Sequence, residues 1–274
     1  MSGLQARGLV LRRGRAVLVD GVDLDLAPGR LLAVVGPNGA GKSSLVGLLG
    51  GAVRPDGGEV RLNGRRLADW PAPELARHRA VLRQQSELGF NFSVREVAEL
   101  GRSPHRGLSS AAEDDRAVAW AMRAAQIDGF ADRLYPTLSG GERQRAQLAR
   151  VLAQLRGRDD GLDGRCLLLD EPTASLDLRH QLELLELAKS LTVRGCAVLA
   201  VLHDLAMAAR YADEVLVMQR GRAVVRGRPA EVLATAQVEA VFEVRLDWRN
   251  GVPVAALPAT PGSAATRPPP SAPQ

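Results

Sequence analysis

The sequence predicts an α/β fold with a largely parallel sheet. Short, continuous apolar runs occupy residues 31–35, 166–169 and 197–202, which is typical of strands buried on both faces. Segments with helical periodicity separate these runs, and strands that alternate with helices build parallel sheets. The composition, 46% hydrophobic and 24% charged over 274 residues, is that of a globular chain, so a fibrous or largely disordered chain is excluded.

The N-terminal elements alternate in the manner of strands. Residues 9–11 and 16–19 flank a turn at 13–15, and residues 22–26 alternate apolar side chains with aspartates. A Pro-Gly turn then leads into the buried run 31–35. A glycine-rich loop and a short helix follow, and a further strand at 59–62 ends in an Asn-Gly turn.

From about residue 71 to residue 154 the pattern is helical. Ser110 and Glu113 have the spacing of a capping box, which predicts a helix over 111–127. Strands are expected again at 166–169, 197–202 and 214–218. The tail, 257–274, is rich in Pro, Ala, Thr and Ser and is predicted to be disordered, which leaves residues 1–256 as the folded domain.

Charge and hydropathy restrict the classes of partner. The net charge is +5, but the basic residues are scattered and aromatic residues make up only 3% of the chain. This distribution argues against nucleic-acid binding, which favours clustered basic residues and stacking aromatics. The longest apolar run, 196–202, is too short to cross a membrane, and the first residues lack a secretory leader's apolar stretch. We therefore expect a soluble chain that can dock on a membrane protein.

A phosphate-binding loop is predicted directly after the run 31–35. The pattern G-x-x-x-x-G-K-S is formed by Gly36, Pro37, Asn38, Gly39, Ala40, Gly41, Lys42 and Ser43. Its backbone N–H groups would surround phosphate oxygens, Lys42 would reach the β- and γ-phosphates, and Ser43 would ligate Mg²⁺. Ser44 occupies the position where the dinucleotide-binding fingerprint needs a third glycine, so the loop does not match that fingerprint. Ser44 is also expected to contact the nucleotide.

Two carboxylates end the apolar run 166–169. Asp170 is placed at the carboxyl end of a strand, where open α/β sheets bind ligands, and would hold Mg²⁺. Glu171 would orient and deprotonate the water that attacks the phosphate.

A second anion site is indicated at Ser139, Gly140 and Gly141, which precede a helix of good helix formers. Ser139 and Glu142 also have capping-box spacing, and both interpretations can hold together.

The segments GPNGAGKSS, LSGGERQR and LLLDEPTASLD, in this order, resemble the ATP-binding subunits of ABC transporters. The resemblance implies a P-loop NTPase with a RecA-like lobe, a helical lobe at about 86–158 that carries LSGG, and a small antiparallel β-lobe. It also implies a head-to-tail homodimer with ATP and Mg²⁺ between one P-loop and the partner's signature. Ser139 and Gly141 would then bind the γ-phosphate of the ATP that the partner holds.

Further positions match the family's motifs. Gln84, with Gln85 as its alternative, resembles the glutamine that ligates Mg²⁺ or water and senses the transmembrane subunit. Asp177 resembles the aspartate that crosses the dimer interface, and His203 the histidine that contacts the γ-phosphate. The aromatic that stacks on adenine in many members is absent here, and Arg13 or Arg12 would take its place, unless Arg13 is simply a solvated turn residue.

Within the family, the chain is most similar to ATPases of iron-chelate and cobalamin importers, in particular those for hemin. The segments that carry this likeness are residues 62–70, 77–84, 92–97, 101–105 and the polar insertion 156–165. The implied partners are a permease dimer and, indirectly, a periplasmic haem-binding protein, with the chain peripheral on the cytoplasmic face of the inner membrane.

Other functions fit less well. Ferric-siderophore and cobalamin importers remain alternatives for the cargo. A nucleic-acid ABC ATPase would carry coiled coils, zinc modules or a second P-loop, and a P-loop kinase or GTPase would lack LSGG. An exporter half-molecule would carry fused membrane spans.

Overall fold

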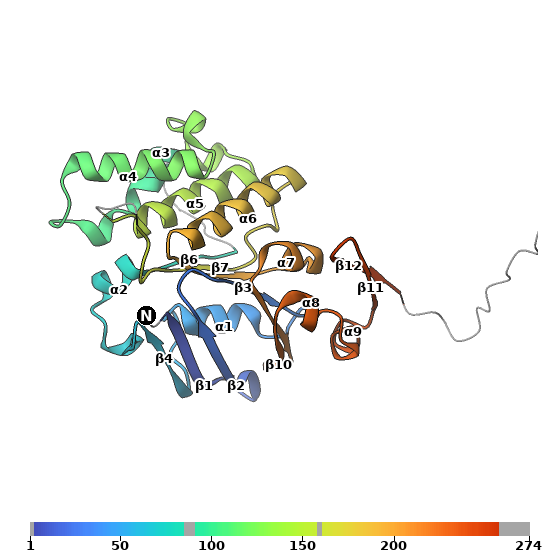
Figure 1. Cartoon of the computed structure of the whole chain (residues 1–274). Coiled ribbons are helices and arrows are strands. Elements are labelled where there is room, and N and C mark those ends of the chain that lie inside the picture. The colour runs from blue at the N-terminus through green and yellow to red at the C-terminus, as the bar shows by residue number, and fades with distance from the viewer. Residues whose placement is uncertain (1–2, 85–90, 158–160, 258–274) are drawn as a thin grey trace, which may run out of the picture.

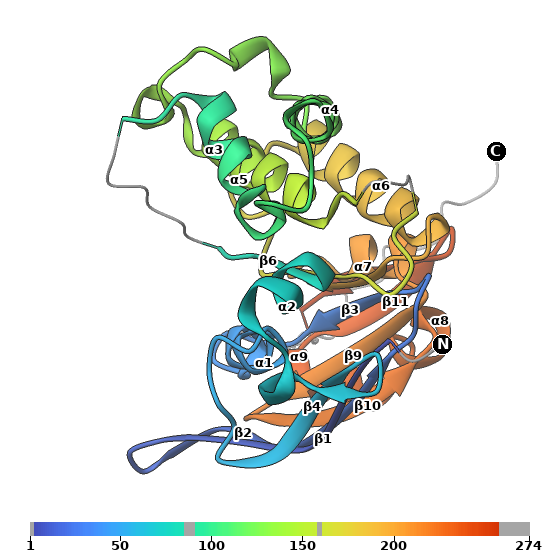
Figure 2. The ribbon, with the colours of Figure 1, turned by 90° about the vertical axis from the view of Figure 1, so that its left-hand side faces the viewer.

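The computed structural model describes residues 3–84, 91–157 and 161–257. Three sequence predictions concern residues outside these ranges. They are Gln85, residues 158–160 of the insertion 156–165, and the tail beyond residue 257. The described elements form a lower body of two sheets with α1 and an upper group of helices, α3, α4 and α5 (Figures 1 and 2). No helix in the described ranges has the length and apolar character needed to cross a bilayer.

A six-stranded sheet forms the centre of the lower body. In spatial order its strands are β10 (Arg222–Gly227), β9 (Glu214–Gln219), β3 (Leu31–Val35), β8 (Ala197–Val201), β7 (Cys166–Leu169) and β6 (Arg79–Leu82). All neighbouring pairs are parallel except β9 with β10. This order confirms the predicted α/β fold. It also brings the carboxyl ends of β3, β6, β7 and β8 to one edge, because parallel strands share their direction.

A second, antiparallel sheet has the order β2 (Ala16–Leu26), β1 (Leu4–Arg13), β4 (Gly57–Leu62) and β5 (Arg65–Arg66). The predicted turn after 59–62 is present, and Asn63 and Gly64 have φ of 51° and 81°. Positive φ at both central residues is the geometry of a tight hairpin, which Asn-Gly adopts readily.

Helix α1 (Lys42–Leu49) packs between the two sheets. Alternate side chains of β3 enter different cores: Leu32 and Val34 pack with α1 and the antiparallel sheet. Leu31, Ala33 and Val35 pack on the opposite face with α6 (Leu178–Val193) and helices of the upper group. Burial on both faces explains why β3 is a continuous apolar run.

The upper helices are α3 (Val94–Leu100), α4 (Ala111–Ala124) and α5 (Gly140–Leu155), and each begins with a capping box. Ser93, Ser110 and Ser139 are the N-caps, so the two boxes predicted from the sequence are confirmed and a third is added. The limits of 86–158 for a helical lobe stay a prediction.

The remaining elements are short. They are α2 (Ala72–His78), α7 (Leu205–Tyr211), α8 (Pro229–Val232), α9 (Ala236–Phe242), the hairpin β11 (Arg245–Arg249) with β12 (Val252–Ala256), and four 3₁₀ turns at Leu67–Asp69, Ser103–His105, Asp128–Phe130 and Tyr135–Thr137.

The structure corrects three sequence expectations. The stretch 71–154 is not helical throughout, because β6 lies inside it as an edge strand of the main sheet. The helix expected over 111–127 ends at Ala124. Residues 16–26 form one strand instead of two, and β10, β11 and β12 were not predicted.

Candidate active site

The predicted phosphate loop joins β3 to α1 and is held between two strands. A side chain at Gly36 would place its Cβ 2.2 Å from the carbonyl oxygen of Met218 in β9. At Gly41 the Cβ would lie 2.3 Å from the carbonyl oxygen of Leu18 in β2, and φ is +97°. Both positions therefore require glycine, and their close approach fixes the loop above the end of the sheet.

Lys42 is the first residue of α1 and is only 5% exposed. Its Nζ donates to the carbonyl oxygens of Gly36 at 2.8 Å and Pro37 at 3.0 Å, so the ammonium lies inside the curve of the loop. Burial lowers the pKa of Lys42, and the nearby carboxylates of Glu171 and Asp170 oppose that shift. If a phosphate binds in the loop, the Lys42 ammonium can exchange its two neutral carbonyl partners for a negatively charged phosphate oxygen.

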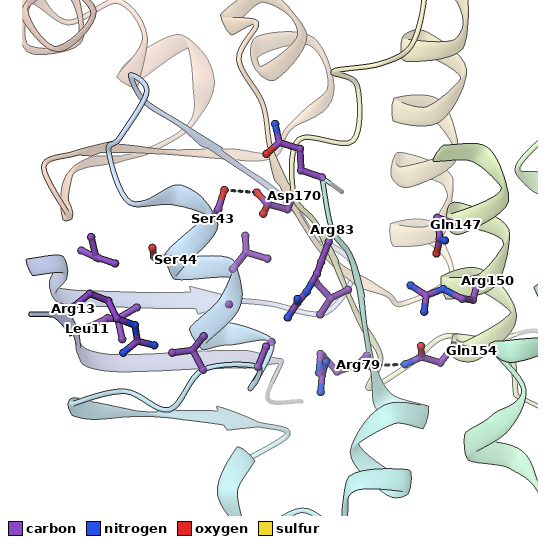
Figure 3. A pocket seen from close by; sticks show the side chains of 18 residues that line it. Leu11, Arg13, Ser43, Ser44, Arg79, Arg83, Gln147, Arg150, Gln154 and Asp170 are labelled. Carbon is purple, nitrogen blue, oxygen red and sulfur yellow. Dashed lines mark hydrogen bonds between the residues drawn. The ribbon is translucent and has the colours of Figure 1, made fainter. Parts of the chain in front are cut away.

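Ser43 and Asp170 meet at the end of the sheet. The Ser43 hydroxyl donates to Oδ1 of Asp170 at 3.0 Å (Figure 3). Asp170 is 8% exposed, and burial raises its pKa while the Ser43 hydrogen bond and Lys42 act in the opposite direction. A buried carboxylate beside a hydroxyl oxygen is a donor set that a hard divalent cation prefers.

Glu171 lies between two of the other predicted residues. Its Oε2 accepts from Nε2 of Gln84 at 2.6 Å, and its Oε1 lies 2.9 Å from Nε2 of His203. The Glu171 side chain is 14% exposed and its backbone has φ of 50°, an uncommon conformation for a residue with a side chain. Gln84, Glu171 and His203 follow β6, β7 and β8, which are neighbours in the sheet.

The predicted second anion site lies on the upper group of helices. Ser139 accepts from the backbone N–H of Glu142, and the Glu142 carboxylate accepts from the backbone N–H of Ser139. Gly141 lies against the loop that leads to α6, since a Cβ there would be 3.2 Å from the carbonyl oxygen of Ser175. In both views α5 and α1 belong to different groups of elements (Figures 1 and 2). The structure therefore does not bring Ser139, Gly140 and Gly141 to the same cavity as Ser43.

Asp177 has a local role as the N-cap of α6. Its Oδ1 accepts from the backbone N–H of His180 at 3.0 Å and lies 2.7 Å from Nδ1 of the same residue. The backbone hydrogen bond is the main reason that the pKa of Asp177 is lowered. The carboxylate is 67% exposed, so it is accessible to a second chain.

Arg13 lines a cavity of about 880 Å³ together with Leu11, Ser43 and Ser44. Figure 3 shows Leu11 and Arg13 on the other side of α1 from Asp170. Arg12 is not among the lining residues, and its backbone N–H donates to Asp56 at 2.6 Å. The geometry favours Arg13 over Arg12 as a contact for a ligand in this cavity.

Sequence reasoning missed several polar residues of the same cavity. Beyond the residues predicted above, the cavity is lined by Arg79, Arg83, Gln147, Arg150 and Gln154. Arg79 and Arg83 bracket the apolar residues of β6, and an arginine on each side of such a short run was the available signal. Arg150 approaches from α5, which only the tertiary fold brings near β6.

Comparisons with known proteins find similar chains in one family. Residues 19–174 match a family model described as ABC transporter. A hemin import ATP-binding protein, HmuV, of Pseudomonas entomophila is 50% identical over 241 residues, covering 88% of this chain and 92% of the relative. HmuV of Myxococcus xanthus is 49% identical over 259 residues and 94% of each chain.

Solved structures give the same fold. The dimeric structure of MJ0796, a bacterial ABC transporter cassette, is 25% identical with a TM-score of 0.72, covering 82% of this chain and 98% of that one. A nucleotide-free ATP-binding cassette from an ABC transporter is 20% identical with a TM-score of 0.75, covering 88% of this chain and 99% of that one.

Proposed function

Because the chain belongs to the ABC transporter ATP-binding family, we propose that it hydrolyses ATP to drive hemin import across the inner membrane. The proposal of ATP hydrolysis rests on the position of Glu171. Gln84 and His203 hold its carboxylate beside the Ser43–Asp170 pair. The assignment of hemin as the cargo rests on the names of the relatives. They are hemin import ATP-binding proteins that are about 50% identical to this chain over most of both sequences.

ATP would bind with its phosphates in the loop 36–43. The backbone N–H groups and the amino end of α1 receive the phosphate oxygens, and Lys42 turns from the carbonyls of Gly36 and Pro37 toward them. Ser44 and Arg13 line the same cavity, on the side where the adenosine would lie.

Two substitutions of Arg13 test whether its side chain stacks on adenine. Replacing Arg13 by Ala is expected to weaken ATP binding by about 1 kcal/mol or less, because a partly exposed stacking contact contributes little. Arg13→Tyr should restore or improve the affinity, since a phenol ring also stacks on adenine. Titration with a fluorescent ATP analogue measures both variants. Unchanged affinity in both would make Arg13 a solvated turn residue.

Mg²⁺ fits the residues present. Ser43 Oγ, Asp170 and Gln84 would hold the ion with water and phosphate oxygens, and when bound it neutralises charge that develops on the transferred phosphoryl group. Burial is the largest cause of the raised pKa of Asp170, and a cation bound beside it would favour the ionised carboxylate.

Glu171 would act as general base. Its two oxygens are held in place by Gln84 and His203, so the carboxylate is aimed before a water molecule arrives. His203 stands at the end of β8, where its ring can contact both Glu171 and a γ-phosphate. Positioning of this kind, together with charge neutralisation, supplies most of the rate in phosphoryl transfer.

Two copies would assemble head to tail. Ser139 and Gly141 then meet the γ-phosphate bound by the partner, and Asp177 reaches across the interface. The absence of Ser139, Gly140 and Gly141 from the lining of the cavity that contains Ser43 supports this arrangement, because a signature that does not meet its own loop is free to meet the partner's.

The dimer would bind a permease dimer at the cytoplasmic face of the inner membrane. A periplasmic haem-binding protein would deliver the cargo to the permease, so this chain itself would not bind hemin. Ferric siderophores and cobalamin remain the alternative cargoes.

The experiment that tests the cargo is reconstitution with the permease in liposomes. We expect ATPase activity to rise when the haem-loaded binding protein is added, because loaded protein biases the permease toward the closed ATPase dimer. Binding proteins loaded with cobalamin or with a ferric siderophore serve as matched comparisons. Stimulation by one of these, with none by the haem-loaded protein, would reassign the cargo and leave the ATPase activity in place.

A further inference from the structure

A second cavity, of about 330 Å³, lies between the end of α2 and the residues that join α3 to α4. Among the described residues it shares no lining residue with the cavity that contains Ser43, so it is separate from the nucleotide site. We call it the basic cavity, because its charged and titratable lining consists of Arg77, Arg102, Arg165, His78, His105 and a single described carboxylate, Glu113.

The acidic groups near the basic cavity do not cancel its positive charge. The Glu113 carboxylate is engaged at the amino end of α4, where it accepts from the backbone N–H of Ser110 at 2.7 Å. Asp114 pairs with Arg102, with 2.8 Å between Oδ1 and Nε. Arg77 makes no ion pair with the residues that the structure describes, and its Nη1 donates to the neutral carbonyl of Pro104 at 2.8 Å. An anion would therefore gain a charged partner at Arg77.

His105 supplies a hydrogen-bond acceptor to the same cavity. Its Nε2 lies 2.9 Å from the carbonyl oxygen of Gln154, which accepts only, so Nε2 carries the proton and Nδ1 of the neutral ring is the acceptor. Nδ1 has no partner in the described ranges and is not sealed from solvent. Burial lowers the pKa of His105, the hydrogen bond to Gln154 opposes that shift, and the charges of the three arginines lower the pKa further. The ring is therefore mainly neutral at pH 7.

A phosphate group matches this combination of donors and acceptor. Its ionised oxygens pair with guanidinium groups. Because its second pKa is about 6, a phosphate or phosphomonoester still carries an O–H in part of the population near neutral pH, and that group can donate to Nδ1 of His105. A carboxylate or a sulfate has no proton to donate at this pH.

We propose that the basic cavity binds the phosphate group of a small molecule, either free phosphate or a phosphomonoester, among Arg77, Arg102 and His105. The volume of about 330 Å³ is at the small end of the range for small-molecule sites. Leu108, which is 51% exposed and lines the same cavity, offers an apolar contact to the rest of an ester.

A ligand in the basic cavity would join elements that Gln154 of α5 already links. The Gln154 side chain donates to the carbonyl oxygens of Ala76 at 2.8 Å and Arg79 at 3.1 Å, and its own carbonyl oxygen is the partner of His105. Arg77 and His78 end α2, directly before β6. The ligand would therefore strengthen the attachment of α2 and β6 to the upper helices, and it would stabilise the chain against unfolding.

NMR of the four histidine rings tests the site directly. Inorganic phosphate and glycerol 3-phosphate should shift the signals of His78 and His105 and raise the pKa of both rings, because a bound anion stabilises the imidazolium. His203 lies beside Glu171 and reports phosphate in the loop 36–43, and His180 of α6 serves as the reference. The probe that binds more tightly identifies the ligand as the free ion or as an ester, and either result supports the site.

Sulfate provides a matched comparison, because it stays a dianion throughout this pH range. It should bind more weakly than phosphate at pH 7.5, and its affinity should rise as the pH falls to about 6, where the histidines take up protons. The charged groups that face the two rings are Arg77, Arg102, Arg165 and Glu113, with Asp114 and Glu74 beyond them. Carboxylates ordinarily titrate below pH 5, so a change in this window belongs to the histidines.

Two substitutions locate the phosphate. Arg77→Gln is expected to weaken phosphate binding about tenfold or more, the loss typical of a charged hydrogen bond. His105→Gln should remove most of the pH dependence of sulfate binding. Arg106→Gln removes an equal charge from an exposed position directly after the 3₁₀ turn Ser103–His105 and is the control, with parental phosphate affinity. Thermal unfolding without phosphate verifies that each variant folds.

Unshifted signals of His78 and His105 with both probes would overturn the proposal, as would parental phosphate affinity in Arg77→Gln. A shift of His203 alone would assign the phosphate to the loop 36–43 and would also overturn it. Sulfate that binds as tightly as phosphate at pH 7.5 would contradict the acceptor role of His105.

Discussion

Glu171→Gln is expected to reduce ATP turnover by about 10²–10⁴-fold, the contribution typical of a general base. The amide is nearly isosteric with the carboxylate and can keep a contact with Gln84 and with His203, but it cannot take a proton from water. Lys42, Ser43 and Asp170 are untouched, so ATP and Mg²⁺ should still bind. The variant should accumulate with Mg-ATP as a closed dimer.

Phosphate release and size-exclusion chromatography with Mg-ATP measure these two effects. Glu231→Gln removes a carboxylate from an exposed position of α8 and is the control, with turnover and monomer fraction like the parent chain. Parental turnover by Glu171→Gln, with only monomer on the column, would remove Glu171 from the mechanism.

Ser139→Arg is expected to abolish hydrolysis while each monomer still binds ATP. The long cationic side chain would occupy the place where the partner's γ-phosphate meets the signature, and position 139 does not line the cavity that contains Ser43 of its own chain. The substitution also removes a helix cap, which costs about 1 kcal/mol of stability.

Ser110→Arg separates these two effects. Ser110 caps α4 with the same capping box as Ser139 caps α5, so the variant loses an equivalent cap in a helix outside the signature. It should hydrolyse ATP normally. Mixing Ser139→Arg with Lys42→Ala should restore activity at one composite site per heterodimer, because each chain supplies the half that the other lacks. Normal hydrolysis by Ser139→Arg alone would contradict the composite site.

Local motifs made the central part of the site predictable. The loop 36–43 and the pair Asp170–Glu171 are contiguous in sequence, and the buried runs beside them identify their strands. The proximity of Gln84, Glu171 and His203 follows from the strand order β8-β7-β6. That order depends on β6, which was missed because it is a four-residue edge strand that begins with an arginine directly after α2.

The arginines that line the cavity of about 880 Å³, Arg79, Arg83 and Arg150, were not predictable in the same way. Arg150 lies far from Arg79 and Arg83 in sequence, and on a helix rich in polar residues nothing distinguishes it from a solvated side chain. Its burial arises because α5 packs against β6, which is a property of the tertiary structure. The positive φ of Glu171 likewise has no signature in composition or periodicity.

The most direct test of the account is hemin transport into proteoliposomes. The permease and this chain are reconstituted with Mg-ATP enclosed in the lumen, and the haem-loaded binding protein is supplied outside. We expect hemin to accumulate inside with the parent chain and to stay outside with Glu171→Gln or without ATP. Equal accumulation with Glu171→Gln, or no accumulation of hemin where cobalamin is transported, would contradict the account.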